Sequence, residues 1–392
     1  MSHSNTSLTT RNYRLYPTKA QEKNLFLILN VCRAWYNMLL CERKYAYELE
    51  GRRVSKYDQL AQVKHYKKTF PQSKQVHSHV LQVATTDADK AFAAFFRRVK
   101  SGEKAGYPRF KGRNHFHSFG FKEHGNGFRL DGKRLKVSGA GKIRVRLHRP
   151  IPENGVIKTC RILHKAGQWY ATFAMEVGQS LPLPETGNVI GIDVGISALI
   201  TISNGEKVKN PNYYRTAQAK LRILQRALQR KVRGGKNRRK ALRAVQRQQM
   251  HVANQRMDVL HKLSTQLIQE NDGIVLEDLS IKNMVRNKHL SKSILDSGWG
   301  MFKPYLTYKA ESAGREVRLV NPAYTSKCCS KCEQVFENFS LFTRWVECHC
   351  GLSLDRDPNA AINILKRSGW DAPVQDNVGV VIATRSVEAT RL

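Results

Sequence analysis

The sequence predicts a multidomain α+β protein with a helical domain, a small antiparallel β-barrel and an α/β domain. Two observations predict this fold class. The spacing of apolar residues changes from a helical period to a period of two near residue 113, and strands alternate with helices from about residue 188. With 392 residues, 41% of them hydrophobic, the chain can form two to four domains and bury a sizeable core.

The helical domain is expected over residues 18–112. Thr18 and Gln21 fit a capping box, which begins a helix. Apolar residues follow at helical spacing, and a second helical pattern runs from Val80 to Val99. The domain ends in a turn with exposed basic and aromatic side chains, including Arg109 and Lys111.

The β-barrel is expected over residues 1–17 and 113–180. Short alternating runs predict five strands, with turns at Asp131-Gly132 and Ala166-Gly167. The N-terminal strand is expected to join this sheet, because a lone strand has no other partner. Residues 181–187, which include Leu-Pro-Leu-Pro, are expected to be a linker.

The α/β domain is expected over residues 188–320 and 351–367. Its strands are predicted at 189–194, 198–202, 274–277 and 317–320, with a helix at 300–313. A helical hairpin over 212–262 is expected to turn at Gly234-Gly235 and to bury Leu221, Leu242 and Val245. A cysteine-rich insertion is expected over 321–350, and residues 368–392 are expected to form a flexible tail.

Three carboxylates far apart in the chain stand in settings that suit a metal site. Asp193 and Glu277 each end an apolar strand, and Asp357 precedes an expected helix start at Pro358. Mg²⁺ prefers carboxylate and water oxygens, and two such ions about 3.5–4 Å apart can hydrolyse a phosphodiester. This order of acids resembles that of RNase H-like folds. Asp193, Glu277 and Asp357 are therefore candidate catalytic residues and ligands of two Mg²⁺ ions.

Each acid also has an ordinary structural interpretation. Asp193 would cap a turn in Gly-x-Asp-x-Gly. Only one of Glu277 and Asp278 can face inward, since strand residues alternate faces. Asp357 would serve as a helix N-cap, and Asp355 lies two residues before it. The shared order and settings of the three acids favour the metal site.

A second metal site is predicted by five cysteines between residues 328 and 350. They contain two close pairs, and four thiolates can hold one tetrahedral, structural Zn²⁺. The candidate ligands are Cys329, Cys332, Cys348 and Cys350. Cys328 is left over, and His349 is an alternative ligand.

The charge of the chain predicts a polyanionic partner. Its 67 Lys and Arg against 31 Asp and Glu give a formal net charge of +36 at pH 7, which is typical of nucleic-acid binding. A membrane surface is the rival. The sequence contains no uninterrupted apolar run of about 18 residues, the length that spans a bilayer, and its first residues lack a signal-peptide core. Clustered thiols fit a reducing compartment, so a cytoplasmic protein without a membrane partner is expected.

The positive charge is concentrated in the helical hairpin. Sixteen Lys and Arg and no acidic residue lie between Lys207 and Met257, which fits a surface that follows phosphates. The expected nucleic-acid contacts lie in this hairpin and in the helical domain, where a glutamine is a candidate for an adenine contact. They are Arg238, Arg239, Lys240, Arg256, Arg109, Lys111 and Gln82.

In combination, these residues resemble the TnpB (OrfB) proteins of insertion sequences, which are compact relatives of type V CRISPR effector nucleases. The resemblance covers roughly residues 11–366 and rests on a series of motifs in one order. They include Arg14-Leu15-Tyr16-Pro17-Thr18, Gly106-Tyr107-Pro108-Arg109-Phe110, Gly191-Ile192-Asp193-Val194-Gly195, Asn254-Gln255-Arg256, Glu277-Asp278-Leu279, Asp355-Arg356-Asp357 and Asn359-Ala360-Ala361. The zinc segment departs from the family, with Glu333 in place of a glycine and a tighter second cysteine pair.

The resemblance implies a wedge-like β domain, a helical recognition domain and a RuvC-like nuclease domain with a zinc-bearing insertion. It implies a guide RNA from the transposon end that pairs with target double-stranded DNA beside a short motif read by the protein. It assigns catalysis to Asp193, Glu277 and Asp357, in preference to Asp355.

Two other functions compete with an RNA-guided endonuclease. Relatives that act as RNA-guided repressors without cleavage have lost catalytic acids, whereas this chain keeps all three. A DNA-joining transposase would use similar carboxylates, but the zinc insertion and the guide-binding motifs count against it. The oligomeric state is left open.

Overall fold

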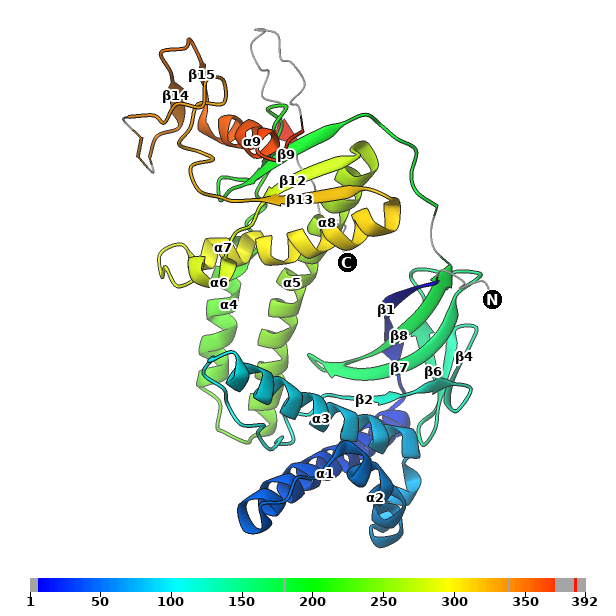
Figure 1. Cartoon of the computed structure of the whole chain (residues 1–392). Coiled ribbons are helices and arrows are strands. Elements are labelled where there is room, and N and C mark those ends of the chain that lie inside the picture. Colours follow the sequence, from blue (N-terminus) through cyan, green and yellow to red (C-terminus); the bar gives the residue numbers. More distant parts are fainter. Residues whose placement is uncertain (1–5, 179–180, 338, 341, 371–383, 386–392) are drawn as a thin grey trace. The chain divides into compact units, whose positions relative to one another are not determined.

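The computed structural model describes residues 6–178, 181–337, 339–340, 342–370 and 384–385. The chain divides into two compact units, Met1–Gln179 and Ser180–Leu392, called unit 1 and unit 2 below (Figure 1). The mixture of helices with a barrel-like sheet confirms the predicted α+β class.

Unit 1 contains three long helices, and the capping box predicted at the first of them is confirmed. The Gln21 N–H donates to Thr18 Oγ1 at 3.3 Å, and the Thr18 N–H donates to Gln21 Oε1 at 3.0 Å. A 3₁₀ turn at Pro71–Gln75 separates the second helix from the third. The helices are α1 (Lys19–Glu50), α2 (Lys56–Thr69) and α3 (Ser78–Lys100).

Within the described residues, α1 is the one helix that is long and apolar enough to cross a membrane. Its apolar stripe is buried in the core of unit 1, with Leu25, Cys32 and Leu39 fully inaccessible. Core helices satisfy the same criteria of length and composition, so α1 needs no bilayer to cover it.

The sheet of unit 1 has eight strands in the order β2-β7-β8-β1-β6-β5-β4-β3. The edge strands β2 and β3 are separated in the chain by Lys122 alone, so the sheet is nearly closed into a barrel. β1 lies between β8 and β6, which confirms the predicted place of the N-terminal strand. The strands are β1 (Thr6–Tyr16), β2 (Ser118–Phe121), β3 (Glu123–His124), β4 (Gly127–Asp131), β5 (Arg134–Val137), β6 (Gly141–Arg146), β7 (Val156–Lys165) and β8 (Gln168–Gly178).

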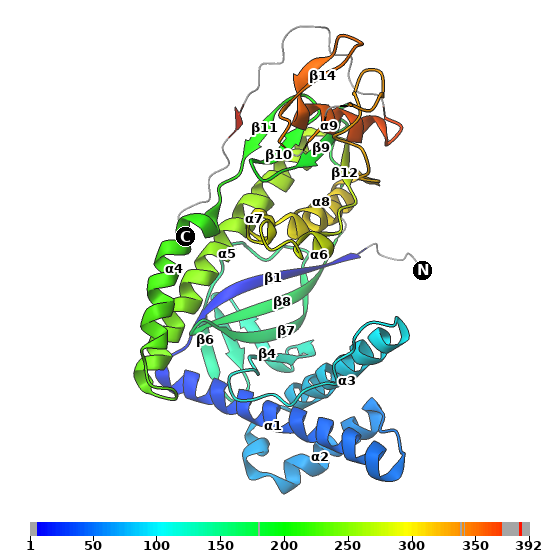
Figure 2. The same ribbon diagram turned by 90° about the vertical axis from the view of Figure 1, so that its left-hand side faces the viewer.

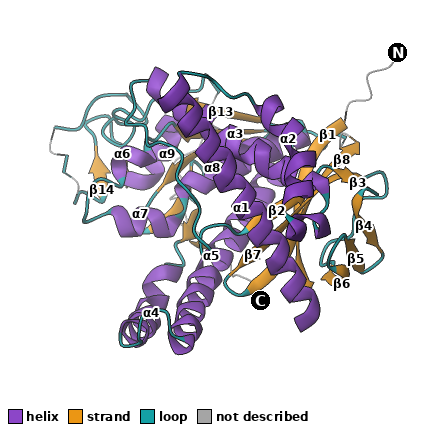
Figure 3. Cartoon of the chain, turned by 90° about the horizontal axis from the view of Figure 1, so that it is seen from below, coloured by secondary structure: helices purple, strands orange, loops and turns teal. Residues whose placement is uncertain are grey.

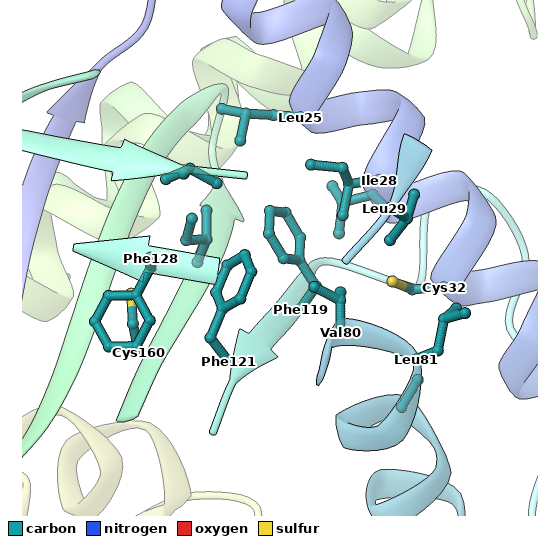
Figure 4. Close-up of a cluster of buried hydrophobic side chains, with 14 of the residues drawn as sticks. Leu25, Ile28, Leu29, Cys32, Val80, Leu81, Phe119, Phe121, Phe128 and Cys160 are labelled. Atoms are coloured by element: carbon teal, nitrogen blue, oxygen red, sulfur yellow. The ribbon is translucent and has the colours of Figure 1, made fainter. Parts of the chain in front are cut away.

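The helices and the sheet of unit 1 share one hydrophobic core. Figure 4 shows side chains of α1 and α3 packed against Phe119, Phe121 and Phe128 of the strands. The sequence predicts two domains here, and the structure packs them as one body because α1 and α3 each bury an apolar face toward the sheet.

Unit 2 is built on a six-stranded sheet in the order β13-β12-β9-β10-β11-β16. β9 runs antiparallel to β10, whereas β12 runs parallel to both β9 and β13. A separate two-stranded sheet pairs β14 (Trp345–Glu347) with β15 (Ser353–Asp355). The six strands are β9 (Val189–Val194), β10 (Ala198–Ile202), β11 (Lys207–Lys209), β12 (Gly273–Glu277), β13 (Glu316–Val320) and β16 (Thr384–Arg385).

Helices cover both faces of this sheet. α5 and α8 lie on one face and α9 on the other (Figure 1). Apolar side chains of α5 and α8 join one core cluster, and Ile364 and Leu365 of α9 join another. The helices are α4 (Tyr213–Gln229), α5 (Lys236–Glu270), α6 (Ile281–Met284), α7 (Ser291–Ser297), α8 (Trp299–Ala313) and α9 (Arg356–Lys366).

The predicted basic hairpin is formed by α4 and α5, which lie side by side and turn at Gly234-Gly235 (Figures 2 and 3). The Asp296 carboxylate holds its base, because it accepts the N–H groups of Tyr214 and Arg215 at the start of α4. The burial predicted for Leu242 is wrong. Its side chain is 40% exposed, since two helices alone cannot enclose the whole apolar stripe.

The start of the predicted tail is packed. The Arg318 guanidinium lies 3.9 Å from the centroid of the Trp370 ring, and that ring fills the space beside Gly273. Residues 368–370 therefore belong to the body of unit 2, which corrects the predicted start of the flexible segment. The rest of the predicted tail lies outside the described residues, apart from β16.

Candidate active site

Strand alternation places Asp193 and Glu277 on the same face of the unit 2 sheet. Ile192 of β9 is paired in parallel register with Leu276 of β12, and both side chains pack toward α5 and α8. The next residues along the strands, Asp193 and Glu277, therefore point to the opposite face, which α9 covers. Both residues are half-buried there.

The absence of a side chain at Gly191 lets α9 approach this face. A Cβ at Gly191 would lie 2.2 Å from the Ala361 carbonyl oxygen and 2.7 Å from the Leu365 nitrogen, and neither backbone atom can yield easily. Asp357 lies one helical turn before Ala361, and Asp193 lies two residues beyond Gly191. This close packing brings Asp357, which is only 9% exposed, to the two strand carboxylates.

The electrostatic environment of Asp193 includes the other two acids. Burial raises the pKa of Asp193 well above its usual range, and the charges of Glu277 and Asp357 raise it further. The Arg356 guanidinium and the Val194 N–H oppose this shift. Burial also raises the pKa of Glu277, against the Thr325 hydroxyl and the charge of Arg367. Mutual repulsion in a partly dry site is the setting in which bound cations are favoured.

The structure gives Asp355 and Asp278 different roles from their neighbours Asp357 and Glu277. Asp355 is the N-cap of α9, because its Oδ1 accepts the Asp357 N–H at 2.9 Å, and its Oδ2 accepts Lys207 Nζ at 2.9 Å. Asp357 stands inside the first turn, with its Oδ1 3.1 Å from the Arg356 guanidinium. The capping role considered for Asp357 thus belongs to Asp355. Asp278 is exposed and pairs with Lys303 at 2.7 Å.

The four cysteines predicted as ligands form one cluster. Their sulfur atoms all lie within 4.8 Å of one another, and two of the separations are 3.5 Å. Four thiolates about 2.3 Å from a tetrahedral Zn²⁺ have similar separations. Cys328 is outside the cluster, which comprises Cys329, Cys332, Cys348 and Cys350.

The thiols of this cluster are free to bind a metal ion. All the cysteines of the chain are free of disulfide bonds. The Leu352 N–H lowers the pKa of Cys350 to about 7, which favours the metal-binding thiolate there, whereas burial raises the pKa of Cys329 to about 12. His349 Nδ1 lies 3.5 Å from Cys348 Sγ, but the four sulfurs complete the group without it.

Two buried asparagines of α9 connect this cluster to the acidic site. Asn359 Nδ2 donates to the Cys328 carbonyl at 2.8 Å, and its Oδ1 accepts the Ser330 N–H at 2.8 Å. Asn363 Nδ2 donates to the same Cys328 carbonyl at 2.7 Å and to the Thr325 carbonyl at 2.8 Å. Neither asparagine is among the site residues predicted from the sequence. The sequence does contain a clue to them, because two asparagines four residues apart lie on the same face of an otherwise apolar helix.

The predicted nucleic-acid contacts differ in how free their side chains are. Arg256 donates to the Asp296 carboxylate at 2.8 Å and to its carbonyl at 2.7 Å, and it is therefore an internal support of the hairpin. Arg238 donates to the Leu228 and Lys231 carbonyls at the end of α4. The remaining candidates are the exposed Arg239, Lys240 and Arg109 and the half-buried Lys111 and Gln82. Their contacts with nucleic acid stay predictions.

Three family models match the chain. They are described as "Probable transposase" over residues 172–288, "Cas12f1-like, TNB domain" over 299–364 and "Helix-turn-helix domain" over 7–52. In the structure, the last range consists of β1 and the uninterrupted helix α1. The second range includes the cysteine cluster and α9 up to residue 364.

Two curated proteins are similar over most of this chain. A "Putative RNA-guided DNA endonuclease" of Streptomyces pristinaespiralis is 35% identical over 90% of this chain and 87% of its own length. A "Putative RNA-guided DNA endonuclease InsQ" of Escherichia coli is 32% identical over 90% of each chain.

A solved structure shares the fold. The chain in a "Cas12f1-sgRNA-target DNA complex" matches with a TM-score of 0.60 at 13% identity, over 92% of this chain and 99% of that one. The matching family models and the extent of identity with the two curated proteins lead to one conclusion: the chain belongs to the TnpB (OrfB) family.

Proposed function

We propose that this protein is an RNA-guided DNA endonuclease that cuts target DNA beside a short motif, using Mg²⁺ bound by Asp193, Glu277 and Asp357. The observation that carries the proposal is the convergence of these carboxylates where β9, β12 and α9 meet. Two relatives named as putative RNA-guided DNA endonucleases support an RNA guide and a DNA target for this protein. The fold that it shares with the protein in a complex with guide RNA and target DNA supports the same partners.

The residues present fit divalent magnesium. Three carboxylates offer the hard oxygen donors that Mg²⁺ prefers, and the burial and neighbouring charges that raise the pKa of Asp193 favour a cation there. When bound, two such ions supply a nucleophilic water and stabilise the leaving oxygen of the phosphodiester.

The protein's own contribution is to hold the carboxylates in place. Neighbouring parallel strands fix the spacing of Asp193 and Glu277, and the docking of α9 at Gly191 fixes Asp357. Partial burial of the site strengthens the interaction of the carboxylates with cations.

The other parts of the chain fit the domains expected of such a nuclease. The barrel-like sheet would be the wedge domain, α1 to α3 the recognition domain, and the sheet of unit 2 a RuvC-like nuclease domain. One structural Zn²⁺ would hold the insertion through Cys329, Cys332, Cys348 and Cys350. The net charge of +36 would be matched by guide RNA and DNA, with base pairing supplying sequence specificity.

Guide dependence is the direct test of this function. The purified protein should carry bound RNA, and sequencing that RNA supplies the guide. A plasmid that matches the guide should be cut at one site with Mg²⁺, and a mismatched plasmid or an RNA-free protein should leave it intact. Binding without cutting would favour the repressor. Equal site-specific cutting in all three cases, or joined DNA ends, would favour the transposase.

The exposed cations of the hairpin should contribute to binding of every nucleic-acid sequence. The double variant Arg239→Gln, Lys240→Gln is expected to weaken binding uniformly. It should also reduce the slope of log K against log salt by about 0.9 for each duplex phosphate that the protein no longer neutralises. Fluorescence anisotropy across a salt series measures both effects.

A matched control removes the same charge elsewhere. Lys44 and Arg52 are already paired with Glu48 and Glu50, so Lys44→Gln, Arg52→Gln should change the salt slope less. Equal slopes for the two double variants would show that net charge alone matters, and the hairpin would then not be a specific phosphate-binding surface.

A further inference from the structure

We infer that Thr325 is a positioning residue that orients Glu277 for metal binding and joins the acidic site to the cysteine cluster. This inference rests on the proposed function, because it assigns Glu277 to a Mg²⁺ site. Thr325 lies between β13 and the first cysteine pair, far from Glu277 in sequence.

The side chains of Thr325 and Glu277 are in direct contact. Thr325 is 3% exposed, and its Oγ1 donates a hydrogen bond to Glu277 Oε1. The Pro322 carbonyl, at 3.2 Å, is the other acceptor within reach of the hydroxyl. A hydroxyl has one proton, and an ionised carboxylate is the stronger acceptor. The bond therefore fixes the rotation of the carboxylate through Oε1 and leaves Oε2 for a cation.

The backbone around Thr325 is held by α9. The Thr325 carbonyl accepts Asn363 Nδ2 at 2.8 Å, and the same amide reaches the Cys328 carbonyl at 2.7 Å. Lys366 Nζ, one turn further along α9, donates to the Ser330 carbonyl at 2.6 Å. Polar side chains of α9 thus hold the segment 325–330 along its length, and Thr325 has little freedom to move.

The same segment leads to the cysteines. Cys329, four residues after Thr325, is a buried member of the thiol cluster. A metal ion at that cluster would fix one end of the segment whose other end holds Glu277. The cysteine cluster therefore acts on the acidic site through Thr325, besides stabilising its own insertion.

The test compares Thr325→Val, which keeps the shape but removes the hydroxyl, with Thr325→Ser, which keeps the hydroxyl. Calorimetric titration of Mn²⁺ into each protein reports metal affinity without requiring activity. The valine variant is expected to bind Mn²⁺ at the acidic site about 10-fold to 100-fold more weakly, the usual effect of losing a partner of a metal ligand. The serine variant should stay close to wild type, and zinc content should be the same in all three proteins.

A double-variant cycle separates orientation from general damage. In a Glu277→Gln background, Thr325→Val should cause little further loss of Mn²⁺ affinity, because its effect passes through Glu277. Wild-type Mn²⁺ affinity in the valine variant, an equal loss in the serine variant, or an undiminished loss in the Glu277→Gln background would each overturn the inference. A wild-type protein that binds Mn²⁺ but cuts no DNA with a matched guide would instead refute the proposed function.

Discussion

Replacing any one of Asp193, Glu277 and Asp357 with its amide is expected to lower guide-directed DNA cleavage about a thousandfold. Such a loss corresponds to about 4 kcal/mol of transition-state stabilisation, the scale on which bound metal ions act. Guide-dependent DNA binding should change little, because the basic surfaces lie on other residues. Cleavage of a labelled plasmid and a gel-shift assay measure the two effects, and EDTA should abolish cutting by the wild type.

Asp355→Asn is the matched control for Asp357→Asn. Asparagine is a good N-cap, so this variant keeps the start of α9 while removing one charge two residues from Asp357. It should retain most of the cleavage activity. A dead Asp355→Asn protein beside a fully active Asp357→Asn protein would show that the third catalytic acid is wrongly assigned.

Asp193→Asn should also stabilise the metal-free fold, because the ionised carboxylate is unfavourable at this position. The pKa of Asp193 is raised in the folded chain, so folding takes up a proton between the usual carboxyl pKa and the raised value. The metal-free protein therefore loses stability as pH rises through that window. The amide removes this loss, and Asp193→Asn should melt at a higher temperature than wild type at neutral pH in EDTA. An equal or lower melting temperature would contradict the burial and charge repulsion that raise the pKa of Asp193.

Loss of one cluster thiolate is expected to unfold the cysteine-rich insertion. Structural zinc contributes roughly 10–16 kcal/mol to the folding of small zinc-finger peptides. Cys329→Ser or Cys350→Ser should therefore remove the one Zn²⁺ per chain and expose the backbone of β14 and β15 to hydrogen exchange. Elemental analysis and exchange mass spectrometry measure these effects.

Cys328→Ser is the control for this prediction, because its sulfur lies outside the cluster. It should keep the zinc and the protection from exchange. A Cys332→Ser protein that retains a full equivalent of zinc would refute the four-thiolate site and direct attention to His349.

Local rules were sufficient to predict most elements and the two strand acids. The capping box at Thr18, the turn at Ala166-Gly167 and the pairing of the N-terminal strand follow from a few adjacent residues or from simple strand geometry. Asp193 and Glu277 stand out as candidates because an acid that ends a buried strand is unusual. Asp357 was harder to assign, because an N-cap and a metal ligand use the same residue types at neighbouring positions.

Features that depend on long-range packing could not be predicted in the same way. Arg256 pairs with Asp296, which lies 40 residues away in the chain. The sequence does not reveal this ion pair, so Arg256 is predicted from sequence as a nucleic-acid contact. The common core of helices and sheet in unit 1 depends on which faces meet, and helical periodicity does not specify that. The role of Thr325 depends on a single hydroxyl in an irregular segment, where no periodic pattern exists.

The position of α9 in the chain determines when the acidic site can form. β9 and β12 carry two of the acids, but the third arrives only with the helix that closes over Gly191. During synthesis, the barrel-like sheet and the basic hairpin emerge from the ribosome before Asp357 does. A nascent or prematurely terminated chain would therefore present the basic hairpin without a complete set of carboxylates. Under the proposed mechanism, cutting would be delayed until translation of the described fold is nearly finished.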